Sequence, residues 1–161
     1  SELPSQKRLV RIYAHSIERM YWPDPTAGEF EQRDFSISPE LERFALHNLV
    51  QQGHRELYRD FEQVNRDLKG VDGDLTRPQL PSKLRELDDK LQQLKDTKMT
   101  AMRELAASAD VVFATCDVAA HHPVLKRAVF AALVIDEAAQ AGEADLAVCC
   151  LSAEQKIVLF G

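Results

Sequence analysis

Short apolar runs that are continuous rather than alternating leave this chain few possible folds. A strand with one face in water alternates apolar and polar residues, whereas a strand of a helix-covered parallel sheet is apolar throughout. The runs at residues 110–115, 132–135 and 156–160 therefore predict parallel strands buried on both faces. A shorter, alternating run at residues 8–13 predicts one more strand. The alanine-rich segment 138–151 lies between two of these strands and predicts a crossover helix, which should be right-handed.

Two helical patterns lie between the first and second of these strands. Ser38 followed by Pro39 is typical of a helix start, and the pattern continues to about Leu68, before a Gly- and Asp-rich stop at residues 70–74. A second start at residues 81–82 precedes leucines spaced three and four apart. The two stripes predict an antiparallel helical hairpin. Its seam should bring together Leu57, Phe61, Val64, Leu84, Leu87, Leu91 and Leu94.

Charged residues of the hairpin lead to two further expectations. Lys98 falls on the apolar stripe, so we expect the seam to weaken or open there. The other charges alternate in sign along the outer faces, which favours a solvated surface supported by i,i+4 pairs. The alternative is a face that docks a partner or touches nucleic acid.

Composition excludes several classes of protein. Apolar residues make up 45% and charged residues 29% of the chain, which excludes collagen-like and wholly disordered proteins. The net charge of −6 gives no support for a generic basic nucleic-acid-binding domain, although a local basic groove stays open. The three cysteines include no CxxC pair, which indicates a reducing compartment, cytoplasm or nucleus. Neither a secretory signal nor a membrane span of about 18 apolar residues is predicted.

An acidic pair, Asp136 and Glu137, directly follows the apolar run 132–135. In open α/β sheets the carboxyl ends of the strands face the ligand crevice. One carboxylate there can hold Mg²⁺, and its neighbour can orient a water for in-line attack on a γ-phosphate. The alternative is two solvated acids at the start of a helix, where negative charge favours the helix dipole. A GxxxxGK[ST] phosphate loop does not occur in the sequence, so we expect the chain to be a piece of a longer protein.

Several segments around this pair match the motifs of a known family in order and spacing. The segment 136–141, DEAAQA, resembles motif II, DExxQA, of the superfamily-1B helicases of the up-frameshift and senataxin type. ADVVFATC at 109–116 resembles the strand that precedes it, and KIVLFG at 156–161 resembles the start of motif III. LVRIYAHS at 9–16 resembles the strand after motif Ia, and FALHN at 44–48 resembles the start of the helical insertion called 1C. Order and spacing agree over essentially the whole chain.

The resemblance implies a partial RecA-like parallel sheet of the P-loop NTPase type with an inserted antiparallel helical hairpin. Residues 1–37 and 109–161 would be RecA-like core, and residues 38–108 the 1C-like insertion. The protein would be an ATP-dependent helicase that couples Mg-ATP hydrolysis to 5′ to 3′ movement on single-stranded RNA or DNA. The remainder of the helicase chain would supply the phosphate loop and a second RecA-like domain, so the isolated fragment would be inactive.

The same resemblance implies roles for five residues. Asp136 would coordinate Mg²⁺, and Glu137 would be the catalytic base that positions the water. Gln140 and Gly161 fall at positions that the family uses around the nucleotide. Thr115 would contact the nucleic-acid backbone through its hydroxyl, or else only cap the loop at the end of its strand.

A second interpretation is a non-enzymatic interaction module, in which the hairpin docks a partner and the acidic pair is inactive. Trp22, Tyr21 and Phe35, in or near the proline-containing loop 20–36, are expected to anchor that loop to the core rather than to stack on bases. Cysteine and histidine spacing fits no usual zinc site, so buried cysteines and a surface turn at 121–122 are expected.

Overall fold

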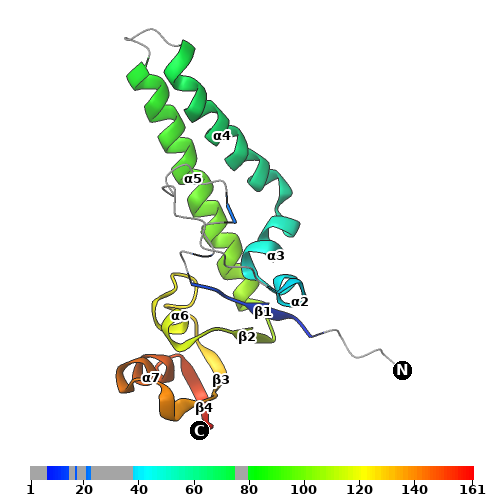
Figure 1. The fold of residues 1–161 in the computed structure, drawn as a ribbon, viewed down its shortest axis with the longest axis vertical. Coiled ribbons are helices and arrows are strands. Elements are labelled where there is room, and N and C mark those ends of the chain that lie inside the picture. The colour runs from blue at the N-terminus through cyan, green and yellow to red at the C-terminus, as the bar shows by residue number, and fades with distance from the viewer. Residues whose placement is uncertain (1–6, 15–16, 18–20, 23–37, 75–79) are drawn as a thin grey trace, which may run out of the picture.

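The computed structural model describes residues 7–14, 17, 21–22, 38–74 and 80–161. A long helical hairpin stands on a smaller part that holds the strands, and the C-terminus lies at the far end from the hairpin tip (Figure 1). This is a mixed α/β structure with small parallel sheets, as predicted. The elements in chain order are β1 Leu9–Arg11, α2 Pro39–Glu42, α3 Leu46–Gly53, α4 Arg55–Asp74, α5 Leu80–Ala107, β2 Val111–Phe113, α6 Cys116–His121, β3 Phe130–Ile135, the 3₁₀ helix η1 Ala138–Gln140, α7 Glu143–Cys150 and β4 Ala153–Leu159.

The described strands form two parallel pairs. β3 pairs with β4, with Leu133 opposite Ile157, and this confirms the predicted parallel arrangement of these two runs. β2 pairs with β1 instead of joining them, so the prediction of a single sheet containing all three runs is wrong for the described residues. Hydrogen bonds at both ends hold β2 against β1: Asp110 N donates to Arg8 O at 2.9 Å, and Ile12 N donates to Phe113 O at 2.9 Å.

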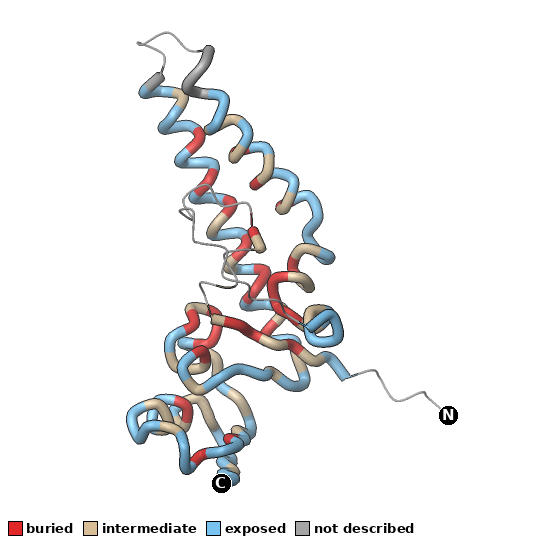
Figure 2. Tube along the Cα trace, viewed as in Figure 1, coloured by how far each residue is buried: buried red, intermediate tan, exposed pale blue. Residues whose placement is uncertain are grey.

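The apolar strands are not buried on both faces, contrary to the prediction (Figure 2). Leu133 and Ile135 pack in one cluster with Leu146 and Cys149 of α7, which confirms that this helix covers a face of the β3–β4 pair. Val134 points the other way because side chains alternate along a strand, and it is 63% exposed. α7 therefore covers one face of the β3–β4 pair, and apolar residues on the other face, such as Val134, are exposed to solvent.

The helical hairpin has the predicted seam. Leu57, Phe61 and Val64 of α4 are buried, and so are Leu87, Leu91 and Leu94 of α5. Leu84 is the exception, at 36% exposed. Red segments run along the facing sides of both helices in Figure 2, with pale blue outside. Most cations and anions of α4 fall on different sides of the helix, although Glu62 lies between Arg59 and Arg66, so the charges alternate in sign over only part of its outer face.

The first half of the hairpin is broken into three helices instead of one continuous helix from Ser38. Phe44 and Ala45 leave the helical path because they meet β1: Arg11 N donates to Phe44 O at 2.8 Å, and Arg11 and Ala45 form a parallel bridge. α3 then ends at Gly53, and His54, with φ −129° and ψ 56°, separates it from α4. α4 runs past Leu68 to Asp74. Tertiary pairing with β1 thus overrides the local helical pattern.

Lys98 does not open the seam, so that prediction is wrong. Its side chain is 7% exposed, and Nζ lies 5.0 Å from the centre of the Trp22 ring and 5.5 Å from that of Phe61. Ring faces attract a cation, which offsets the cost of burying it. Trp22 also packs against Tyr58, at 5.7 Å between ring centres, so its expected anchoring role is confirmed. Phe35 and most of the loop 20–36 lie outside the described residues.

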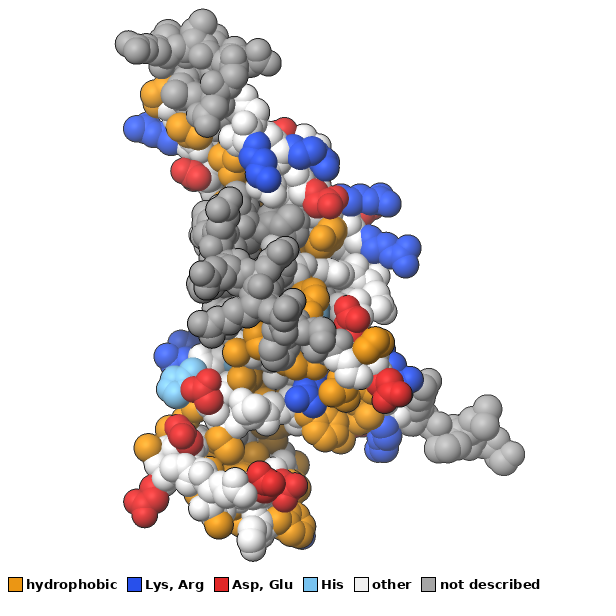
Figure 3. Space-filling view, viewed as in Figure 1, with side chains coloured by type: hydrophobic (Ala, Val, Ile, Leu, Met, Phe, Trp, Pro, Cys, Tyr) orange, Lys and Arg blue, Asp and Glu red, His pale blue; other side chains and the backbone are white. Residues whose placement is uncertain are grey.

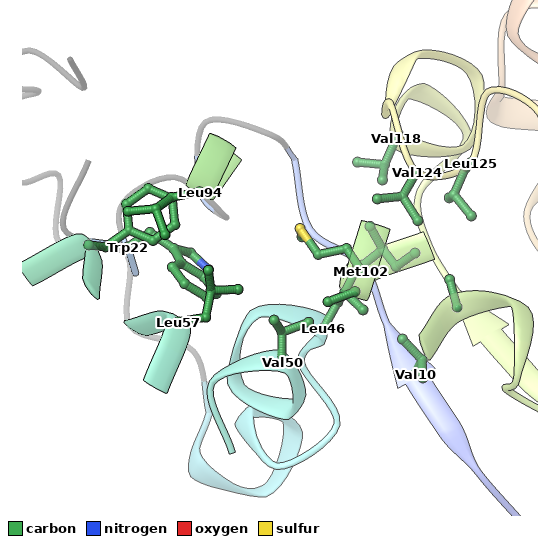
Figure 4. Close-up of a cluster of buried hydrophobic side chains, with 14 of the residues drawn as sticks. Val10, Trp22, Leu46, Val50, Leu57, Leu94, Met102, Val118, Val124 and Leu125 are labelled. Atoms are coloured by element: carbon green, nitrogen blue, oxygen red, sulfur yellow. The ribbon is translucent and has the colours of Figure 1, made fainter. Parts of the chain in front are cut away.

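The main core cluster extends from the hairpin seam to α6. It includes Val10, Leu46, Val50, Met102, Val118, Val124 and Leu125 (Figure 4). His122 belongs to this region too: it is 2% exposed, and its Nδ1 accepts a hydrogen bond from Val124 N at 3.2 Å. The expected surface turn is therefore wrong for His122, although His121 is exposed. Within the described ranges, no helix is both long and apolar enough to span a bilayer.

Candidate active site

Asp136 and Glu137 form an exposed turn between β3 and η1, here called the acidic turn. Glu137 has φ 53° and ψ 38°, and it is the only non-glycine residue with positive φ in the described part of the chain. A left-handed non-glycine residue costs about 1–3 kcal/mol and persists only where its surroundings hold it. Glu137 N donates to Asp136 Oδ1 at 3.0 Å, which fixes the turn locally. The chain thus leaves the strand within one residue, and both carboxylates lie exposed at its carboxyl end.

The end of β4 holds the acidic turn from the other side. Phe160 N donates to Ile135 O at 2.9 Å, and Ala138 N donates to Phe160 O at 2.7 Å. Gly161 follows directly and lies against η1: a Cβ built on Gly161 would be 3.1 Å from Ala139 N and 3.3 Å from Ala139 Cβ. Because the nearest atom is main chain, a larger residue would have to displace η1.

Four of the five predicted site residues are therefore brought together. Asp136, Glu137 and Gln140 share the turn and η1, and Gly161 packs on the same segment. Gln140 N donates to Glu137 O at 2.9 Å, which closes η1. The sequence analysis did not identify Ala138 and Ala139 as the residues against which Gly161 packs. The signal for this contact was the presence of two small residues between the acidic pair and Gln140.

An apolar cluster includes the residues on either side of the acidic turn, Ile135 and Ala138. Ile135, Ala138 and Cys149 are buried there. Cys149 Sγ donates to Cys116 O at 3.5 Å, which links the end of α7 to the start of α6. Burial, together with the neighbouring Cys116 thiol, raises the pKa of Cys149 to about 11. Cys149 is therefore a neutral packing residue at physiological pH, as expected for a buried cysteine.

Thr115 lies apart from the acidic turn, at the start of α6. It is the N-cap of this helix, and Oγ1 accepts a hydrogen bond from Val118 N at 3.4 Å. The next residue, Cys116, packs against the apolar cluster under the acidic turn. The hydroxyl thus does cap local main chain, as one of its two predicted roles requires, but it caps a helix rather than a loop, and Thr115 stays exposed. Its contact with nucleic acid stays a prediction.

The donor set of the acidic turn fits a nucleotide-bound magnesium ion. Mg²⁺ keeps several of its waters and is usually held by one or two carboxylates together with substrate phosphates. Asp136 and Glu137 supply two exposed carboxylates, and only Oδ1 of Asp136 is used by the turn itself. Among the residues that the structure describes, no three His, Cys, Asp or Glu side chains gather as an all-protein metal cage.

Comparison with known proteins agrees with the parallel α/β geometry. A family model described as an AAA domain matches residues 6–161, nearly the whole chain. A comparison with curated proteins found no match. The family match supports the P-loop nucleoside-triphosphatase class to which the motif resemblance points, and it does not single out a member.

Proposed function

The chain belongs to the AAA-domain family, and from this membership we propose that it is part of an ATP-dependent superfamily-1 helicase motor. This motor couples Mg-ATP hydrolysis to movement along single-stranded RNA or DNA. One observation carries the proposal: a left-handed Glu137 beside Asp136 is held at the carboxyl end of a parallel strand pair. Ligands bind at this end of the strands in open α/β sheets.

The two carboxylates have separate roles in this proposal. Asp136 would hold the magnesium ion of Mg-ATP. Such an ion would supply positive charge that stabilises the phosphate oxygens during phosphoryl transfer. Glu137 orients the attacking water and takes its proton, which requires a carboxylate in a fixed position.

The strain at Glu137 favours this function over the alternative of a non-enzymatic module. Two solvated acids at a helix start need no left-handed residue, and a residue with ordinary dihedral angles would avoid the cost. Backbone strain of this kind clusters at functional sites, where surrounding contacts hold it. Here those contacts come from Phe160 and Gly161.

Thr115 connects this site to nucleic acid in the proposal. Its exposed hydroxyl contacts a backbone phosphate, and α6 carries the effect to the acidic turn. The contacts for this route are the hydrogen bond from Cys149 Sγ to Cys116 O and the apolar cluster that contains Cys116 and Ile135. Nucleic acid would then change the position of the carboxylates and hence the hydrolysis rate.

The remaining expectations complete the proposal. The remainder of the helicase chain supplies the phosphate loop and the second RecA-like domain, and residues 38–108 form the inserted helical subdomain. The protein acts in the cytoplasm or nucleus.

The test is the ATPase rate of the full-length protein with Mg²⁺, with and without a single-stranded oligonucleotide. Hydrolysis that nucleic acid stimulates supports the proposal, and a protein with no ATPase activity in either condition contradicts it.

A further inference from the structure

The outward face of α4 carries a row of cations, which we call the basic ridge. It consists of Arg55, Arg59, Arg66 and Lys69, all exposed. At 3.6 residues per turn these four positions fall within about 80° of one another around the helix. The buried residues Leu57, Phe61 and Val64 lie on the opposite side, against α5. Figure 3 shows basic side chains along the edge of α4 that faces away from α5.

The acids of α4 are placed elsewhere on the helix. Glu56, Asp60 and Asp67 fall together on one flank, about 100–140° around the helix from Arg55. Only Glu62 lies within the ridge. Like charges one turn apart, such as Arg55 and Arg59, destabilise an isolated helix. Glu62 can pair favourably with Arg59 and Arg66, but Arg55–Arg59 and Arg66–Lys69 are repulsive, so helix stability alone does not account for four cations on one face.

A hollow of about 250 Å³ lies at the foot of the basic ridge. Arg55 and Arg59 line it together with Tyr58, Gln51 and Glu62. Guanidinium groups match phosphate oxygens with paired, charge-assisted hydrogen bonds. Farther along the ridge, Arg66 Nη2 donates to Gln63 Oε1 at 2.9 Å. Because the glutamine side chain is neutral, this hydrogen bond does not neutralise the positive charge of Arg66.

The spacing of the cations indicates an extended polyanion rather than a single phosphate. From Arg55 to Lys69 the ridge rises over about 21 Å at 1.5 Å per residue. The chain as a whole is acidic, with a net charge of −6, so this face is a local exception that attracts a polyanion. We propose that the basic ridge binds the phosphodiester backbone of nucleic acid, at a surface separate from the acidic turn. The choice of nucleic acid over an acidic protein rests on the proposed helicase function.

Binding of a labelled single-stranded oligonucleotide to the full-length protein over a range of salt concentrations tests this proposal. The ridge variant is Arg55→Gln/Arg59→Gln/Arg66→Gln. Each lost phosphate contact reduces the slope of log affinity against log salt by about 0.7, so the slope should fall by about 2. The control variant Arg85→Gln/Lys90→Gln/Arg103→Gln removes three exposed cations of α5 and should keep the wild-type slope. Circular dichroism checks that both variants keep their helices.

Glu62→Gln gives a test of opposite sign, because it removes the one anion on the basic ridge. Binding should tighten by about twofold or more at low salt, a gain that damage to the fold would not produce. If wild-type protein binds the oligonucleotide and the ridge variant keeps the wild-type slope, the basic ridge does not bind nucleic acid. The proposed motor function is not affected by that result. Wild-type protein that hydrolyses ATP but binds no oligonucleotide overturns both the ridge and the nucleic-acid part of the proposed function. An equal loss of slope in the ridge and control variants also overturns the ridge, because the effect is then one of net charge.

Discussion

Ala138 donates a 2.7 Å main-chain hydrogen bond to Phe160, and this bond ties the acidic turn after β3 to the end of β4. The adjacent bond from Phe160 N to Ile135 O completes the link at 2.9 Å. Two segments that resemble motif II and motif III are thus one structural unit. A substitution at the end of β4 should therefore change the position of Glu137.

Gly161→Ala tests this link. The new Cβ would lie 3.1 Å from Ala139 N, a main-chain atom that can yield only if η1 moves. The contact requires η1 to yield by a few tenths of an ångström. Because a misplacement of about 1 Å in a catalytic group can cost about a hundredfold in rate, we expect this smaller shift to lower kcat for ATP hydrolysis by about threefold. Steady-state kinetics of the full-length protein measures it.

Gly70→Ala is the matched control, because a Cβ there has nothing within 4 Å. Gly70 lies inside α4, so alanine should raise stability by about 0.5–1 kcal/mol and leave kcat unchanged. If Gly161→Ala also left kcat unchanged, the close contact with Ala139 would have no part in positioning Glu137.

Leu91→Ala tests the hairpin seam. Leu91 is 4% exposed and packs in the main core cluster, so its truncation should lower the free energy of unfolding by about 2–4 kcal/mol. Leu84→Ala should cost less than about 1 kcal/mol, since that side chain is already 36% exposed. Urea denaturation followed by circular dichroism compares the two, and equal costs would show that the seam is not packed as described.

The sequence predicts the seam and the β3–β4 pair because both depend on local periodicity. Leu57, Phe61 and Val64 recur at helical spacing, and the stretches 132–135 and 157–160 are uniformly apolar. The pairing of β1 with β2 joins Arg8 to Asp110, and the burial of Lys98 depends on Trp22. Partners so distant in the chain leave no local pattern.

The candidate site, too, was predictable from the sequence only in part. DEAAQA marks the two carboxylates and Gln140 in the sequence. The left-handed backbone of Glu137 is not readable from residue type, because glutamate rarely adopts it. The fit of Gly161 against Ala139 likewise follows from the meeting of two strand ends.

The pH dependence of stability tests the environment of Cys149. Burial raises the pKa of its thiol from about 9 to about 11, so the unfolded chain ionises before the folded one. Stability from this group is complete below pH 9 and falls as pH rises toward 11. The difference in unfolding free energy between wild type and Cys149→Ala, measured from pH 8 to pH 11, isolates it. A difference that does not change with pH contradicts the buried thiol.

Thr115→Asp separates the two roles of Thr115. Aspartate is a good N-cap, so stability should stay within about 0.5 kcal/mol of wild type, whereas Thr115→Ala should cost about 0.5–2 kcal/mol. The new negative charge should repel a backbone phosphate, and oligonucleotide stimulation of the ATPase should fall severalfold in Thr115→Asp. Stimulation equal to wild type would show that Thr115 only caps α6.

The ATPase rate of Glu137→Gln, measured together with Mg-ATP affinity, tests the central claim most directly. Glutamine keeps the size and hydrogen bonding of the side chain but cannot take a proton from water. We predict wild-type affinity for Mg-ATP and loss of oligonucleotide-stimulated hydrolysis, whereas the companion variant Asp136→Asn should mainly weaken Mg-dependent binding. A stimulated rate in Glu137→Gln within about tenfold of wild type, roughly 1.4 kcal/mol of barrier, would contradict the assignment of Glu137 as the catalytic carboxylate.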